Sequence, residues 1–125
     1  MKPTIAVIDD DEGVRTSLSS LVRSLGYEVR TYGSAPAFLH DADTAGVGCI
    51  ITDLQMPQMT GEQLQAELVS SGGAPPMIFL TAFPTQATRD RVMAMGACAF
   101  LGKPVDGNAI ARHLAQVFAG TSARD

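Results

Sequence analysis

The sequence predicts a doubly wound α/β fold, in which one five-stranded parallel sheet carries helices on both faces. The chain has 125 residues, the length of a single domain. Short apolar runs alternate with amphipathic segments five times, and such alternation predicts parallel strands joined by right-handed crossovers. A (β/α) barrel would need about twice this length. The strand order that best fits five such units is 2-1-3-4-5, the flavodoxin-like (β/α)5 arrangement.

The five expected strands differ in how much of each is apolar. Four are continuous apolar runs at residues 4–8, 49–52, 77–80 and 99–101. Continuous runs of this length indicate strands that are buried on both faces. Residues 28–32 alternate polar and apolar side chains, which predicts a strand at the edge of the sheet.

Amphipathic segments separate these strands. In the first, apolar residues recur at the i, i+4, i+7, i+8 and i+11 spacing of one helix face and end before Gly26, a helix stop. These residues are Val14, Leu18, Leu21, Val22 and Leu25. Shorter helices are expected at 36–40, 61–70 and 85–95.

A last helix is indicated by the same spacing at Ile110, Leu114, Val117 and Phe118. The residues beyond it, 120–125, are small and polar, as in a frayed end or the start of a linker. We therefore expect one domain over residues 1–119 and a tail over 120–125.

Composition excludes several classes of protein. Hydrophobic residues make up 46% and charged residues 18%, which is typical of a folded globular domain. No apolar run approaches the roughly 20 residues of a membrane span, and the first apolar stretch is too short for a signal peptide. The net charge of −4 argues against direct nucleic-acid binding by this segment. Cys49 and Cys98 form no metal or redox motif, so we expect a reduced, cytoplasmic protein.

Polar residues stand where four of the expected strands end. Asp9, Asp10 and Asp11 follow the first strand, Asp53 ends the third, Thr81 ends the fourth, and Lys103 follows the fifth. Sites in doubly wound sheets lie at the carboxyl ends of the strands, where the strand order reverses. That point lies between strands one and three, so the carboxylates are expected to converge there.

Converging carboxylates need a compensating cation. Two unit charges about 4 Å apart repel by roughly 4 kcal/mol at an effective dielectric constant of 20. Lys103 supplies one positive charge, and Mg²⁺ is the divalent ion that best suits one or two carboxylates plus water. A carboxylate surrounded by Mg²⁺, a lysine and a threonine hydroxyl is also suited to bind a phosphoryl group.

Four segments, taken in order, resemble the motifs of the receiver domain of bacterial response regulators. They are Ile8-Asp9-Asp10-Asp11-Glu12, Thr52-Asp53-Leu54-Gln55-Met56-Pro57, Phe79-Leu80-Thr81-Ala82 and Phe100-Leu101-Gly102-Lys103-Pro104. The resemblance covers about residues 4–118 and is similar in appearance to receivers of the nitrogen-fixation regulator type. Receivers of that type usually precede a helix-turn-helix output domain.

The resemblance implies that Asp53 is the phosphoacceptor for a phosphohistidine of a sensor histidine kinase or phosphotransfer protein. It implies that Asp10 ligates Mg²⁺ directly, that Asp9 assists through water or hydrogen bonds, and that Asp53 and the Gln55 carbonyl complete the protein's ligands. Lys103 is expected to pair with Asp53 and then with the phosphoryl group. The Lys103–Pro104 peptide bond is often cis in this family.

The resemblance also implies a conformational switch. Thr81 would move to the phosphoryl group and Phe100 would turn inward, changing the face formed by about residues 85–118, through which a phosphorylation-dependent homodimer could form. Gln55 and Phe83 occupy the two variable positions that set the phosphoryl lifetime. Phe83 cannot accept a hydrogen bond, which favours slow self-dephosphorylation. We expect a signalling switch that catalyses only its own phosphorylation and dephosphorylation.

Two alternatives stay open at this point. The chain could be a complete single-domain regulator that acts by protein binding, instead of the receiver of a longer transcription factor. A more distant alternative is a haloacid-dehalogenase-like phosphatase with Asp9 as nucleophile and Asp11 as acid/base. That alternative leaves Asp53 without a role, and Asp11 is expected instead to cap the helix that follows it.

Overall fold

The computed structural model of this protein describes residues 2–41 and 44–122. Five parallel strands form its sheet. The strand order is β2-β1-β3-β4-β5, which confirms the predicted doubly wound topology. The strands are β1 (Thr4–Ile8), β2 (Glu28–Tyr32), β3 (Val47–Asp53), β4 (Met77–Thr81) and β5 (Ala99–Gly102). β3 begins two residues before the expected run, because Val47 pairs with Thr4 of β1, and the register shifts past Gly48 before Cys49 pairs with Ile5.

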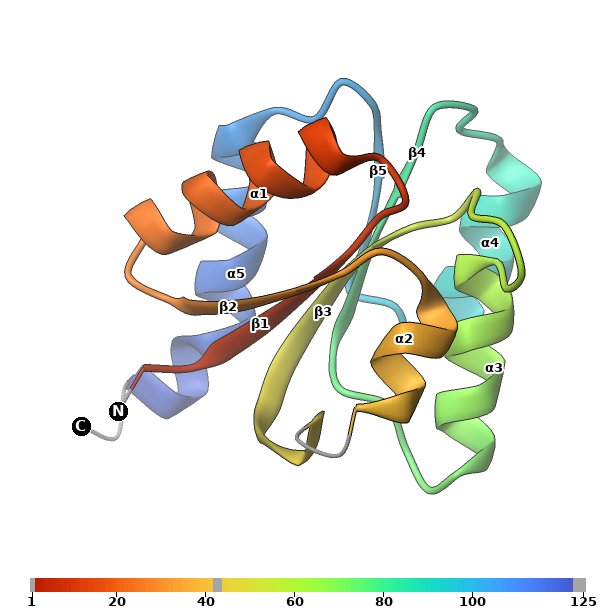
Figure 1. Ribbon diagram of the computed structural model, residues 1–125, viewed down its shortest axis with the longest axis horizontal. Helices are drawn as coiled ribbons and strands as arrows, with labels where there is room; N and C mark the ends of the chain where they lie inside the picture. The colour runs from red at the N-terminus through yellow and green to blue at the C-terminus, as the bar shows by residue number, and fades with distance from the viewer. Residues whose placement is uncertain (1, 42–43, 123–125) are drawn as a thin grey trace.

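The helices cover both faces of the sheet. Helices α1 and α5 lie on one face, and α2, α3 and α4 lie on the other (Figure 1). Their bounds are α1 (Glu12–Ser24), α2 (Ala35–His40), α3 (Gly61–Ser70), α4 (Gln86–Ala94) and α5 (Gly107–Ser122), with a 3-10 turn, η1, at Thr44–Gly46. Helix α5 continues into the expected tail at 120–125, and residues 123–125 lie outside the described residues. No helix in the described ranges is both long enough and apolar enough to cross a membrane.

Two apolar clusters, one on each face, make the core. Alternate residues of a strand point to opposite faces, so Ile5 and Val7 join the cluster under α1 and α5, whereas Ala6 and Ile8 join the other. The four β1 residues 5–8 are fully buried, as expected for a central strand. β2 contains only exposed and half-buried residues and is the first strand of the sheet, which confirms its expected place at the edge.

The register brings the carboxyl ends of the strands together. Ile8 pairs with Thr52, Asp53 pairs with Leu80, and Thr81 pairs with Gly102. The residue that ends each strand therefore lies at the same edge of the sheet, close to the end of its neighbour.

A close packing contact holds the loop after β3. Gly61, the first residue of α3, donates its backbone N–H to the Leu54 carbonyl at 3.0 Å. A Cβ at Gly61 would lie 2.7 Å from the Asp53 carbonyl oxygen. Only glycine leaves room for the backbone to pass this close to the residue that ends β3.

Candidate functional site

The predicted polar residues come together at the carboxyl edge of the sheet, in the upper centre of Figure 1. Asp9, directly after β1, is 1% exposed, and Asp53, the last residue of β3, is 6% exposed. Thr81 ends β4 and is fully buried, and Lys103 directly follows β5. The topology therefore brings together the four residues that the sequence placed at different strand ends.

Lys103 joins the two buried carboxylates. Its Nζ donates to Asp9 Oδ2 at 3.0 Å and to Asp53 Oδ2 at 3.1 Å. The other oxygen of each aspartate accepts from a backbone N–H two residues further along the chain. Asp9 Oδ1 accepts from Asp11 at 2.9 Å, and Asp53 Oδ1 accepts from Gln55 at 3.2 Å. Both carboxylates are thus held in fixed orientations.

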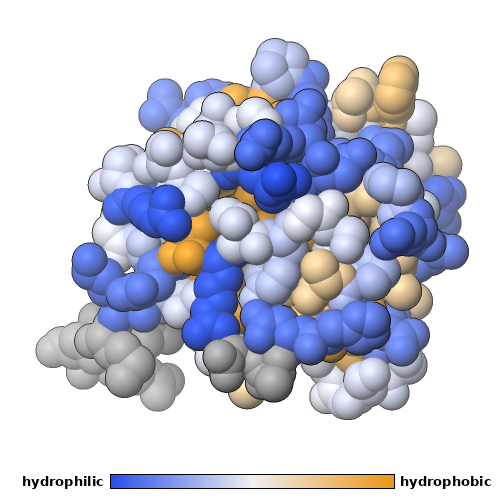
Figure 2. Space-filling view, viewed as in Figure 1, coloured by the Kyte–Doolittle hydropathy of each residue, from blue (hydrophilic) through white to orange (hydrophobic). Residues whose placement is uncertain are grey.

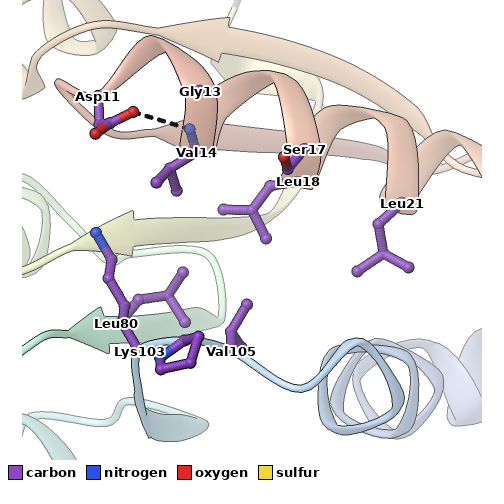
Figure 3. A pocket seen from close by; sticks show the side chains of 10 residues that line it. Asp11, Gly13, Val14, Ser17, Leu18, Leu21, Leu80, Lys103 and Val105 are labelled. Atoms are coloured by element: carbon purple, nitrogen blue, oxygen red, sulfur yellow. Dashed lines mark hydrogen bonds between the residues drawn. The ribbon is translucent and has the colours of Figure 1, made fainter.

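An apolar groove of about 710 Å³ lies beside Lys103, between α1 and the segment that follows β5. Figure 3 shows the Lys103 side chain at its edge, with the nitrogen directed away from the aliphatic residues. The aliphatic lining is Val14, Leu18, Leu21, Leu80, Pro104 and Val105. Such a lining suits the methylene stem of a lysine whose ammonium group reaches polar partners. The Lys103–Pro104 peptide bond is cis, as the resemblance implied.

The carboxylates outnumber the cations at this edge. Asp9, Asp10 and Asp53 each offer an oxygen within 4.8 Å of the others, and Lys103 pairs with two of them. Burial raises the pKa of Asp53 above its ordinary value, and the charge of Asp9 adds to this, although the hydrogen bond from Lys103 opposes it. Burial by itself lowers the pKa of Lys103, but hydrogen bonds to Asp9 and Asp53 outweigh burial and raise it.

These three carboxylates fit a hard divalent cation. They are all oxygen donors, they lie close together, and one lysine leaves them with an excess of negative charge. Mg²⁺ is commonly held by one or two carboxylates together with water and phosphate oxygens. The residues present therefore suit the ion that the sequence predicted.

Thr81 and Gln55 form a second hydrogen-bonded group next to Asp53. Thr81 Oγ1 donates to Gln55 Oε1 at 2.8 Å and accepts from the Phe83 backbone N–H at 3.0 Å. The Phe83 side chain is 72% exposed. The loop between β4 and α4, which carries it, has hydrophobic colouring at the upper right of Figure 2. Phe100 is 9% exposed and packs in the core cluster with Phe79 and Val92, and its expected movement stays a prediction.

The structure also shows contacts that sequence reasoning missed. Arg15, in the first turns of α1, donates from a guanidinium nitrogen to the Asp9 carbonyl oxygen at 2.7 Å. Gln55 was expected to contribute its backbone, yet its side chain reaches Thr81. Neither contact has a local signal, because each depends on how a helix or loop lies across a neighbouring strand.

Asp11 lies outside this group of functional side chains. Its carboxylate accepts from the Val14 backbone N–H at 3.0 Å and caps α1, as expected (Figure 3). The phosphatase alternative requires Asp11 as an acid/base, whereas the structure uses this carboxylate to cap α1. The observed geometry counts against that alternative.

Comparison with known proteins gives a consistent result. A family model described as the response regulator receiver domain matches residues 5–115. The response regulator protein TmoT of Ectopseudomonas mendocina is 39% identical over 100 residues, which are 80% of this chain and 46% of that protein. The transcriptional regulatory protein FixJ of Azorhizobium caulinodans is 40% identical over 106 residues, 85% of this chain and 50% of that protein. The chain thus spans about half the length of these curated relatives.

Solved structures agree with the sequence matches. The crystal structure of FixJ-N superimposes with a TM-score of 0.83 and 31% identity, and the match covers 94% of each chain. The response regulator StyR superimposes with a TM-score of 0.85 and 36% identity, over 99% of this chain and 63% of that one.

Proposed function

Because the chain belongs to the response regulator receiver domain family, we propose that it is a phosphorylation switch with Asp53 as the phosphoacceptor. The observation that best supports this role is the environment of the Asp53 carboxylate. Lys103 contacts one oxygen, a backbone N–H contacts the other, and the Asp9 and Asp10 carboxylates lie within 4.8 Å. A nucleophile, a cation for phosphoryl oxygens and a set of metal ligands are therefore adjacent.

In the proposed reaction, an Asp53 oxygen attacks the phosphorus of a phosphohistidine carried by a sensor histidine kinase or a phosphotransfer protein. A new P–O bond forms as the P–N bond breaks, and the histidine leaves with the N–P electron pair. Phosphoryl transfer needs mainly positioning and charge neutralisation. Lys103 provides a positive charge 3.1 Å from the attacking carboxylate.

Asp9, Asp10 and Asp53 would hold Mg²⁺ together with the Gln55 backbone carbonyl. When bound, this ion would neutralise charge on the phosphoryl oxygens. Asp9 also contributes through Lys103, because its carboxylate holds the ammonium group beside Asp53. Its own backbone is fixed by Arg15 and by the backbone of Tyr32, whose carbonyl accepts from the Asp9 N–H at 3.1 Å.

Phosphorylation would change geometry more than charge. Asp53 is already anionic, so the added charge is smaller than the −1.5 to −2 gained when a serine is phosphorylated. The acyl phosphate places new acceptor oxygens near Lys103 and Thr81. Movement of Thr81 would then change the α4, β5 and α5 face around Phe100, whose ring already packs in the core before phosphorylation.

Helix α4 is lightly anchored, which supports its proposed role in the switch. Val92 is its only fully buried residue. Polar contacts from α3 supply further attachments, with Glu62 bonded to Arg91 at 2.8 Å and the Gln65 side chain donating to the Val92 carbonyl at 3.0 Å. An element with so few apolar contacts can change position at low cost.

We propose that the output is control of transcription through a domain that follows the 1–119 receiver unit, with 120–125 as a tail or linker. Support comes from relatives named as transcriptional regulatory proteins, of which the matched residues make up 50% and 44% of the length. A phosphorylation-dependent homodimer through about residues 85–118 is part of this proposal, as is a cytoplasmic location. Action as a single-domain regulator is the alternative.

The phosphoryl lifetime is proposed to be long. Phe83 lies two residues after Thr81 and offers no side-chain hydrogen bond to an attacking water. Gln55 occupies the other variable position that sets the phosphoryl lifetime, and its side-chain amide oxygen already accepts a hydrogen bond from Thr81. With no carboxylate at the Phe83 position to orient water, hydrolysis should be slow.

Intact mass after incubation with acetyl phosphate and Mg²⁺ tests the proposed function. We expect the wild type to gain one phosphoryl group, and Asp53→Asn or removal of the metal to abolish the gain. Asp90→Asn, an exposed substitution on α4, is the matched control and should behave as wild type. Absence of the gain in the wild type, or its persistence in Asp53→Asn, would contradict the proposal. Turnover of a phosphate ester that survives Asp53→Asn but not Asp9→Asn would instead support the phosphatase.

A further inference from the structure

The hydroxyl of Thr81 already donates a hydrogen bond before any phosphoryl group is present. Its Oγ1 donates to Gln55 Oε1 at 2.8 Å and accepts from the Phe83 N–H at 3.0 Å. A threonine hydroxyl has one proton. It therefore cannot donate to Gln55 and to a phosphoryl oxygen at the same time, and movement toward Asp53 must break the bond to Gln55.

Gln55 forms hydrogen bonds with both Asp53 and Thr81. It lies two residues after Asp53, and its backbone N–H donates to Asp53 Oδ1 at 3.2 Å. Its side chain reaches across to the end of the neighbouring strand, where Asp53 pairs with Leu80 and Thr81 follows. The same residue thus contacts the phosphoacceptor through its backbone and the switch threonine through its amide.

We propose that the Gln55 side chain is a positioning residue that holds Thr81 in the resting arrangement and so lowers the affinity of the site for a phosphoryl group. This inference rests on the proposed receiver function and concerns its regulation. Every phosphoryl group bound through Thr81 must displace the Gln55 amide. The net strength of a neutral hydrogen bond in water corresponds to a shift of roughly 2- to 10-fold in an equilibrium.

The effect differs from control of the phosphoryl lifetime. The Gln55 amide acts on the position of Thr81 before a phosphoryl group arrives, and thus on binding and on the fraction of active protein. Its removal should favour the active arrangement even with a phosphoryl analogue that cannot be hydrolysed.

The test is a titration with beryllofluoride, an analogue of the phosphoryl group, at saturating Mg²⁺. Gln55→Met keeps the backbone carbonyl and the side-chain length but removes the amide oxygen. We expect it to lower the Kd for beryllofluoride roughly 2- to 10-fold. In the free protein, the NMR signals of the Thr81 methyl and the Phe83 amide should move toward their positions in the saturated wild type.

Two further variants separate positioning from a general structural effect. Glu67→Met introduces the same side chain at an exposed residue of α3, outside the proposed switch face of residues 85–118, and should keep the wild-type Kd. Thr81→Val removes the hydroxyl, so adding Gln55→Met to it should change the Kd no further. Such a double-mutant cycle isolates the interaction between the two side chains.

The outcomes distinguish the two proposals. If the wild type does not bind beryllofluoride, the receiver function and the role of Gln55 both fail. If the wild type binds, the receiver function stands. The role of Gln55 is then overturned if Gln55→Met has a Kd for beryllofluoride equal to or higher than that of the wild type. It is also overturned if Gln55→Met still increases the affinity in the Thr81→Val background.

Discussion

Replacing the phosphoacceptor by an uncharged residue should stabilise the metal-free protein. The Asp53 carboxylate lies within 4.8 Å of oxygens of both Asp9 and Asp10, and 3.1 Å from the Lys103 ammonium. At an effective dielectric constant of about 20, a carboxylate oxygen 4.8 Å away repels by about 3.5 kcal/mol, and the attraction to Lys103 is about 5 kcal/mol. Asp10 is exposed, so water weakens its share of the repulsion. Burial of the charged form is the largest cause that raises the pKa of Asp53, and burial together with repulsion outweighs the attraction to Lys103.

Asn at position 53 cannot accept from both Lys103 and the Gln55 backbone, which offsets part of the gain. We therefore expect Asp53→Asn to raise the free energy of unfolding by about 1–2 kcal/mol at pH 7 without Mg²⁺. The raised pKa of Asp53 means that the folded wild type binds its proton more tightly than the unfolded chain. The wild type is therefore relatively more stable below the ordinary aspartate pKa and loses this stability as the pH rises through the raised pKa.

Urea denaturation of wild type, Asp53→Asn and the exposed control Asp90→Asn between pH 7 and pH 4 checks both points. The difference between wild type and Asp53→Asn should narrow as the pH falls. Saturating Mg²⁺ should also reduce the difference in unfolding free energy. The ion binds the folded wild type through the Asp53 carboxylate and stabilises it more than Asp53→Asn, which lacks that charge. A less stable Asp53→Asn at pH 7, or a difference independent of pH, would refute the electrostatic reasoning.

Three further predictions concern other parts of the site. Phe83→Glu should shorten the half-life of the aspartyl phosphate, measured by loss of mass over time, because a carboxylate can orient the attacking water; a wild-type half-life equal to or shorter than that of the variant contradicts this. Gly61→Ala should lower the free energy of unfolding by about 1–3 kcal/mol in urea, because its Cβ would meet the Asp53 carbonyl at 2.7 Å. Gly46→Ala, where no atom lies within 4 Å, is the control and should change stability little. Lys103→Met should lower the free energy of unfolding of the metal-free protein at pH 7 by about 2–3 kcal/mol in urea. This is less than for a fully buried ion pair, because the Lys103 side chain is 22% exposed. The loss should be smaller in an Asp53→Asn background, where one of the two carboxylates that pair with Lys103 is absent.

Most of the fold could be predicted because its signals are local. Continuous apolar runs and amphipathic segments each report the burial of their own residues, and their alternation restricts the topology to very few arrangements. Element ends were less predictable. Helix α5 extends through residues 120–122, where the sequence has no apolar periodicity that would predict a helix.

The main residues of the site could be predicted because topology alone brings them together. Asp9, Asp53, Thr81 and Lys103 stand at or next to the carboxyl ends of parallel strands, so strand order is enough to make them neighbours. The Gln55 contact with Thr81 could not be predicted in this way. It depends on the path of the loop after β3 and on the direction of a long side chain, and no spacing in the sequence encodes either.

Locating the phosphoryl group on the chain tests the central claim most directly. The protein would be incubated with acetyl phosphate and Mg²⁺, the acyl phosphate reduced with borohydride, and the peptides sequenced by mass spectrometry. Reduction at Asp53 alone, absent when Mg²⁺ is omitted, is the predicted result. Modification at Asp9 or Asp10, or a phosphoryl group on His40 or His113 with Asp53 unchanged, would contradict the assignment of Asp53 as the phosphoacceptor.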